Sequence, residues 1–175
     1  MIDDRKVLLA LGGNEAGAWG EPAEAIERAL AELDRRGVVI TRVSRLIATA
    51  PIGPLPQAVY ANAAASGETG LDPDALLALL KRLEAAAGRR PGARWGPRPL
   101  DIDILDYNGL VQGWDTPHDP ARPAHLVLPH PELHKRTFVL EPLAEIAPKW
   151  RHPVLDETAA NLLITLRAGP VGRGG

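Results

Sequence analysis

The chain has 175 residues, a net charge of −2 and no cysteine. The length fits a single domain, and the near-neutral charge does not favour nucleic-acid binding, which usually needs a strong basic excess. The lack of cysteine excludes disulfides and thiolate metal sites. No apolar run approaches the roughly 20 residues that span a bilayer, and the acidic start does not resemble a signal peptide. We therefore expect a cytoplasmic protein with neither nucleic acid nor membrane as a partner.

The first half of the chain alternates between strand and helix patterns. Residues 7–11 form an apolar run that enters a Gly-Gly-Asn turn, which predicts a strand. Helical spacing of apolar residues begins at Pro22, a residue suited to the first helical position. The β-branched run 38–47 predicts one strand, and residues 60–68 predict another.

The second half begins with a helix for which Asp72 is the expected N-cap. Residues 100–107 alternate between apolar and polar side chains, as a strand does. Residues 108–128 show no periodicity and are expected to form a long loop, an inert insertion. A short helical stretch is predicted within 131–147, and a last helix over about 156–167.

The resulting order β-α-β-β-α-β over residues 7–107 is typical of ferredoxin-like proteins. We therefore predict an α+β fold, a ferredoxin-like α/β sandwich in which an antiparallel sheet is flanked by helices. A single domain is expected over 1–167, followed by a disordered tail at 168–175. Such a fold alone does not determine a function.

Asp101 and Asp103 are two residues apart on the predicted strand 100–107, so both side chains face the same side. Two neighbouring carboxylates repel each other unless a cation lies between them, and hard oxygen ligands suit magnesium. The same spacing occurs in Asp72-Pro73-Asp74, where it indicates a helix cap. The pair alone therefore leaves open both a magnesium site and a solvated strand face.

A basic loop leads directly into this pair. Residues 85–100 contain no acid and four arginines: Arg89, Arg90, Arg94 and Arg98. Guanidinium groups bind phosphate oxygens with paired donors, while magnesium binds the same oxygens from another side. The loop and the carboxylates together predict a polyphosphate substrate. The sequence lacks the P-loop, dinucleotide and protein-kinase motifs, so a less common phosphoryl-transfer fold is expected.

The string RWGPRPLDIDI, from Arg94 to Ile104, resembles the signature of the 6-hydroxymethyl-7,8-dihydropterin pyrophosphokinase family. Further segments resemble the family in the same order: LALGGN at 9–14, TAPIG at 49–53, YANA at 60–63, LPH at 128–130, RTF at 136–138, and residues 141–148. The resemblance implies a kinase of folate biosynthesis that transfers pyrophosphate from ATP to the hydroxymethyl group of a reduced pterin and releases AMP.

The resemblance also implies roles for individual residues. The expected catalytic residues are Arg89, Arg94, Arg98, Asp101 and Asp103, of which the two aspartates would hold two Mg²⁺ ions bound with ATP. The expected ATP contacts are Lys81, Glu84, Arg89, Arg98, Ile104, His130 and Arg136. The expected pterin contacts are Thr49, Ile52, Tyr60, Asn62, Trp95 and Phe138. A monomer is implied as well.

Other interpretations stay open at this point. Another magnesium-dependent phosphoryl or nucleotidyl transferase could use the same carboxylates. A non-enzymatic ferredoxin-like module that binds RNA would need exposed aromatics and a basic face, whereas strand 100–107 offers acids. Tyr60 and Phe138 could simply pack in the core. His130 and His134 do not match a helical zinc motif, and His152 is expected at the surface.

Overall fold

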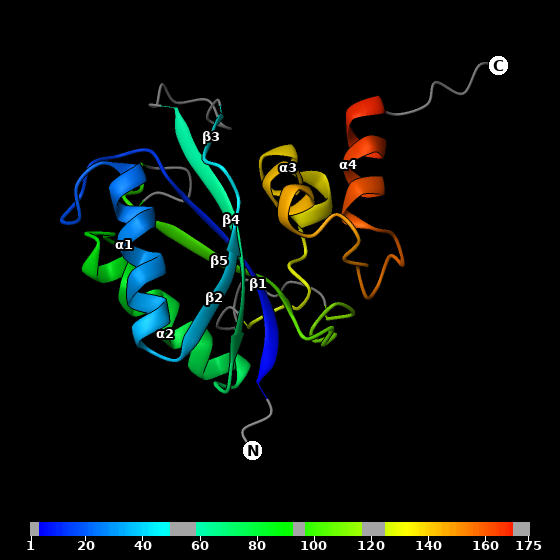
Figure 1. The fold of residues 1–175 in the computed structure, drawn as a ribbon, viewed down its shortest axis with the longest axis horizontal. Helices are drawn as coiled ribbons and strands as arrows, with labels where there is room; N and C mark the ends of the chain where they lie inside the picture. The colour runs from blue at the N-terminus through cyan, green and yellow to red at the C-terminus, as the bar shows by residue number, and fades with distance from the viewer. Residues whose placement is uncertain (1–3, 50–58, 93–96, 117–124, 170–175) are drawn as a thin grey trace.

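The computed structural model describes residues 4–49, 59–92, 97–116 and 125–169 (Figure 1). Its strands and helices follow the predicted order closely. The elements are β1 Arg5–Gly13, α1 Pro22–Arg35, β2 Val38–Val43, β3 Ile47–Thr49, β4 Tyr60–Thr69, α2 Pro73–Ala86, β5 Asp101–Tyr107, the 3-10 turn η1 Leu133–Lys135, α3 Thr137–Ile146 and α4 Ala159–Ala168. None of the described helices is long and apolar enough to cross a membrane.

The strands form one antiparallel sheet in the order β2-β4-β1-β5. The predicted strand over 38–47 is split into β2 and β3, which pair with successive parts of β4. Ser44 causes the break, because its hydroxyl accepts a hydrogen bond from the Ala64 amide at 2.8 Å in place of a backbone carbonyl. Together β2 and β3 make one interrupted edge of the sheet.

Helices cover both faces of this sheet (Figure 1). α1 and α2 lie on one face, and α3, with α4 packed against it, lies on the other. The predicted ferredoxin-like α+β fold is confirmed, with α3 and α4 as a third layer. Gly169 follows α4 with φ of +71°, and the rest of the predicted tail lies outside the described residues.

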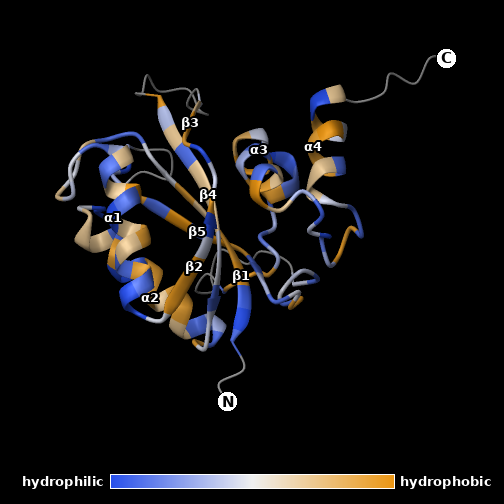
Figure 2. Cartoon of the chain, viewed as in Figure 1, coloured by the Kyte–Doolittle hydropathy of each residue, from blue (hydrophilic) through white to orange (hydrophobic). Residues whose placement is uncertain are grey.

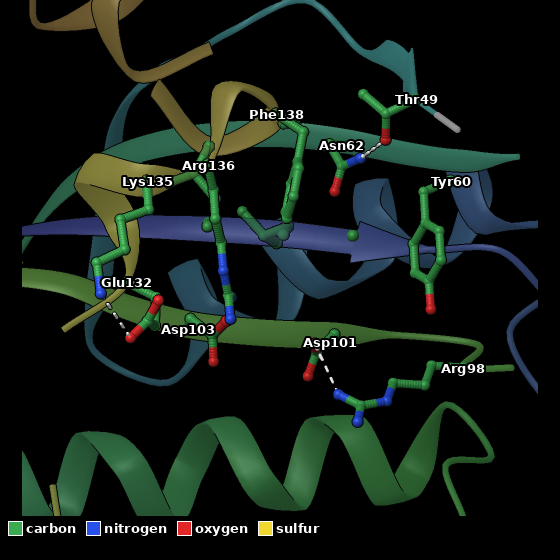
Figure 3. Close-up of a pocket in the computed structure, with 15 residues that line it drawn as sticks. Thr49, Tyr60, Asn62, Arg98, Asp101, Asp103, Glu132, Lys135, Arg136 and Phe138 are labelled. Atoms are coloured by element: carbon green, nitrogen blue, oxygen red, sulfur yellow. Dashed lines mark hydrogen bonds and ion pairs between the residues drawn. The ribbon is translucent and has the colours of Figure 1, made fainter. Parts of the chain in front are cut away.

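The main core lies between the sheet and α1 with α2. It is aliphatic, as Figure 2 shows by the apolar colouring of the strands and of the helix sides turned toward them. Strand β5 contributes Ile102 and Ile104 to this core, both at most 3% exposed. Its alternation turns Asp101 and Asp103 to the opposite face, toward α3 (Figure 3). The sequence pattern predicted this division correctly.

A group of aromatic rings outside the main core joins Trp114, near the start of the long loop, to the chain between α3 and α4. Trp114 donates its indole N–H to the Pro129 carbonyl at 2.7 Å, and its ring lies 5.3 Å from that of His152. His152 is therefore fully buried, which corrects the prediction of a surface position. Its Nδ1 accepts the backbone N–H groups of Val154 and Leu155 at 3.2 and 3.1 Å. The contact between Trp114 and His152 joins distant segments, so the local sequence pattern does not indicate it.

Acid should weaken the fold through this residue. Burial lowers the pKa of His152 to about 4, whereas an unfolded chain keeps an ordinary value near 6.5. Neutral His152 therefore stabilises the fold above pH 6.5, and that contribution is lost as the pH falls through 4. Urea unfolding from pH 7 to 4 should show a shallower loss of stability in His152→Gln than in the wild type. The control His125→Gln, at an exposed loop position, should follow the wild type.

Candidate active site

The two aspartates of β5 lie in a pocket of about 450 Å³ on the sheet face that α3 only partly covers (Figure 3). Strands β1, β4 and β5 form its floor, and η1 with the start of α3 forms one wall. Its polar and aromatic lining comprises Thr49, Tyr60, Asn62, Arg98, Asp101, Asp103, Glu132, Lys135, Arg136 and Phe138.

Asp101 is held by two arginines from the basic loop. Its Oδ1 accepts a hydrogen bond from Arg89 Nη1 at 2.7 Å, and its Oδ2 accepts one from Arg98 Nη1 at 3.1 Å. All three side chains are about one-quarter exposed, so the charges are only partly screened by water. The carboxylate and the guanidinium groups thus neutralise each other in this structure.

Glu84 supports this arrangement from α2. Its side chain is 2% exposed, and its Oε2 lies 2.6 Å from Arg89 Nη1 and 3.1 Å from Lys81 Nζ. Its Oε1 accepts the Ile102 amide at 2.8 Å, which closes an otherwise open backbone position at the free edge of β5. Burial raises the pKa of Glu84, while the Ile102 amide, Lys81 and Arg89 oppose the rise. Glu84 therefore fixes both Arg89 and β5.

Asp103 differs from Asp101 in its surroundings. Burial on the pocket floor and the neighbouring Asp101 raise the pKa of Asp103 to about 6. The nearest histidine, His130, places Nε2 3.9 Å from the Asp103 carboxylate. Because His130 Nδ1 accepts the Glu132 amide at 3.1 Å, the proton of the neutral ring is on Nε2. Burial and the charge of Arg136 lower the pKa of His130 to about 4, so it is a neutral donor.

The other half of the pocket is suited to a flat, polar ring. Asn62 donates from Nδ2 to Thr49 Oγ1 at 2.6 Å, which leaves its Oδ1 turned toward Gly12. A Cβ on Gly12 would lie 2.7 Å from that oxygen, so the glycine gives the amide its room. The rings of Tyr60 and Phe138 stand on either side of Asn62 (Figure 3). Aromatic faces beside a paired donor and acceptor fit a heterocycle with an amide-like edge.

The turn after β1 holds the arginine loop in place. Asn14 is 6% exposed and makes two hydrogen bonds of 2.9 Å to the backbone of Arg98, one from its amide and one to its Oδ1. Gly13 lets the Pro99 carbonyl approach β1, where a Cβ would collide with it. Sequence reasoning noted the Gly-Gly-Asn turn but gave Asn14 no role, because the contact spans more than eighty residues.

The structure brings most of the predicted site residues together but not all. Ile104 turns its side chain into the core beneath α2, so only its backbone is available near the pocket. Lys81, Glu84 and Arg89 stand behind Asp101 rather than in the pocket lining. The predicted residues Ile52, Arg94 and Trp95 lie outside the described residues.

The donor set fits magnesium shared with a substrate. Among the described residues, no group of three or more histidine, aspartate or glutamate side chains is arranged to hold a metal by itself. Magnesium commonly binds through one or two carboxylates together with substrate phosphates and water. Asp101 and Asp103 supply the two carboxylates, and the adjoining arginines suit the phosphates. This chemistry is that of an ATP-dependent phosphoryl-group transferase.

Comparison with known proteins narrows this class to one family. The family model of 7,8-dihydro-6-hydroxymethylpterin-pyrophosphokinase (HPPK) matches residues 8–148. The chain therefore belongs to this family, which confirms the resemblance seen in the sequence. Members of the family transfer a pyrophosphoryl group from ATP to hydroxymethyldihydropterin in folate synthesis, and they use ATP with magnesium.

Individual relatives are similar to the chain over most of its length. A 2-amino-4-hydroxy-6-hydroxymethyldihydropteridine pyrophosphokinase of Pseudomonas aeruginosa is 39% identical over 85% of this chain and 85% of its own. A mitochondrial folate synthesis bifunctional protein of Arabidopsis thaliana is 38% identical over 82% of this chain, which spans only 24% of that protein. A crystal structure of Plasmodium falciparum HPPK-DHPS superposes with a TM-score of 0.72 at 16% identity, covering 93% of this chain and 45% of that one. At this low identity, the similarity to the Plasmodium structure shows a shared fold only.

Replacing Glu84 tests its supporting role. Glu84→Gln can still accept the Ile102 amide, but its neutral amide no longer pairs with Arg89 and Lys81. We expect the free energy of unfolding to fall by about 1 to 3 kcal/mol, because Arg89 and Lys81 lose a buried, charged acceptor. Urea denaturation measures this. The matched control is Glu32→Gln, whose ion pairs join largely exposed arginines of α1 and which should change stability by less than about 1 kcal/mol.

Proposed function

We propose that this chain transfers the pyrophosphoryl group of ATP to the hydroxymethyl oxygen of 6-hydroxymethyl-7,8-dihydropterin. That oxygen attacks the β-phosphorus, the bond from the β-phosphorus to the bridging oxygen of AMP breaks, and AMP leaves. The observation that carries the proposal is one pocket in which a carboxylate pair with arginines adjoins an amide flanked by two aromatic rings. One half suits a polyphosphate and the other suits a pterin.

Asp101 and Asp103 would hold the magnesium, two ions in our proposal. When bound, magnesium neutralises the negative charge of the phosphates and of the attacking oxygen. Asp101 must then exchange its arginine partners for metal, and Arg89 and Arg98 become available to phosphate oxygens. Their side chains need little movement, because both already point at the carboxylate that would share the phosphates with them.

The remaining ATP contacts are proposed from the same geometry. His130 would donate from Nε2 to a phosphate, since its proton is already on the side of Asp103. Arg136 lines the pocket from the start of α3 and offers a further cation. Ile104 would contribute its backbone at the free edge of β5. Lys81 lies outside the pocket lining and contacts Glu84, and we assign Glu84 a positioning role rather than a nucleotide contact.

On the pterin side, Phe138 and Tyr60 would stack on the ring faces, and Asn62 with Thr49 would bind the polar edge. The predicted contacts of Ile52 and Trp95 and the catalytic role of Arg94 remain predictions. We also propose a single domain over 1–167, because the pocket draws its lining from Ala10 through Val139. The family resemblance suggests a monomer, and we propose a cytoplasmic location.

Formation of AMP tests the central proposal. Purified chain mixed with ATP, magnesium and 6-hydroxymethyl-7,8-dihydropterin should form AMP in amounts equal to the pyrophosphorylated pterin. Asp101→Ala should slow this at least about a hundredfold, because a major electrostatic contribution is lost, while pterin binding persists. Asp74→Ala removes the same charge from an exposed position of α2 and should leave the rate unchanged. The proposal would be refuted if AMP formed at the same rate without the pterin, or if a variant lacking both Asp101 and Asp103 still formed AMP at the wild-type rate.

Phe138 tests the pterin half separately. Phe138→Leu keeps an apolar side chain but removes the aromatic face. We expect KM for the pterin to rise about three- to tenfold, since ring stacking contributes about 0.5 to 1.5 kcal/mol beyond buried area. KM for ATP should change less than twofold. Steady-state kinetics with each substrate varied in turn provides both values, and equal changes in the two would place Phe138 outside the pterin site.

A further inference from the structure

We propose that Lys135 is an additional binding residue for the polyphosphate of ATP and that Glu132 holds it at the pocket rim until ATP enters. This inference rests on the proposed function and adds a determinant of its ATP affinity. Lys135 is the last residue of η1 and Glu132 immediately precedes that turn, and both line the pocket on the side of Asp103 and Arg136 (Figure 3). Neither belongs to the motifs that pointed to phosphate binding.

The contact between them is weak enough to exchange. Lys135 Nζ lies 3.4 Å from Glu132 Oε1, and the two side chains are 60% and 43% exposed. Exposed pairs of this kind, three residues apart, contribute at most about 1 kcal/mol. A polyphosphate brings several negative oxygens into the same space and therefore competes well with one solvated carboxylate.

Three other cations in or near the pocket are engaged more firmly. Arg89 and Arg98 bind Asp101 with side chains about one-quarter exposed, and Lys81 binds the buried carboxylate of Glu84. Each must give up a better shielded partner before it can meet a phosphate. Among the ion pairs described around the pocket, the one between Lys135 and Glu132 is thus the easiest to open. Lys135 can therefore exchange its carboxylate for an incoming phosphate more readily than these three cations, next to Arg136, which lines the same wall.

Glu132 has an opposite effect on the same ligand. Its carboxylate lies on the pocket wall with Asp103 nearby in Figure 3, so it adds negative charge where the phosphates arrive. It also keeps Lys135 turned to itself. Removing its charge should consequently favour ATP, whereas removing the charge of Lys135 should disfavour it. Opposite signs from two residues in contact distinguish this role from general damage to the wall.

The experiment measures binding of magnesium with α,β-methylene-ATP, in which the bond to be broken is blocked, by calorimetry on the full chain. Lys135→Gln should raise Kd about three- to tenfold, and Glu132→Gln should lower it about two- to fivefold. The double variant should bind the analogue more weakly than Glu132→Gln but more tightly than Lys135→Gln, because the lysine is lost while the negative charge of Glu132 is lost as well. Lys149→Gln, an exposed lysine after α3, is the matched control and should bind as the wild type does.

Two further readouts separate the possible failures. Adenosine, which lacks phosphate, should bind Lys135→Gln and the wild type equally, and KM for the pterin should not change. If wild-type chain forms AMP but Lys135→Gln keeps the wild-type Kd for the analogue, this inference is wrong and the proposed function stands. If Lys135→Gln weakens adenosine as much as the analogue, the residue is structural. If wild-type chain forms no AMP, the proposed function itself fails.

Discussion

The buried carboxylate of Glu84 is the contact on which the site depends most. β5 is an edge strand, and without Glu84 its free edge beside the pocket would leave the Ile102 amide without a partner. Glu84 accepts that amide and binds Arg89, which in turn binds Asp101. Glu84 of α2 thus fixes the edge of β5 and also positions the guanidinium group of Arg89 beside Asp101. The carboxylate can remain charged at 2% exposure only because these partners surround it.

Under the proposed function, this linkage would make the pocket selective for metal and phosphate together. Magnesium alone would take Asp101 from Arg89 and Arg98 and leave two guanidinium groups without their carboxylate. A phosphate alone would draw the arginines away and leave Asp101 beside Asp103 with no cation between them. Only a metal-bound polyphosphate supplies both exchanges at once. Burial is the main reason that the pKa of Asp103 is raised to about 6, and the charge of the neighbouring Asp101 raises it further.

Sequence could predict what depends on neighbours along the chain. The alternation of β5 separated Ile102 from Asp101, and Asp72 caps α2 as expected, with its Oδ1 accepting the Ala75 amide at 2.8 Å. Contacts between distant segments could not be predicted. The burial of His152 and the split of the 38–47 strand at Ser44 both come from partners far away in the sequence. The family motifs contain most of the residues that line the pocket. They do not indicate which side chains hold those residues in position.

The turn between β1 and α1 shows why the two halves of the pocket occur together. Gly12 faces Asn62, and Gly13, the next residue, faces the Pro99 carbonyl just before Asp101. Adjacent strand residues point to opposite sides, so consecutive glycines let β4 side chains approach on one side and the arginine loop on the other. Asn14 then binds the loop backbone at Arg98. The last two residues of β1, which have no side chains, and Asn14 after them therefore set the spacing between the proposed ring-binding and phosphate-binding halves. A transfer between two bound substrates requires such a fixed spacing.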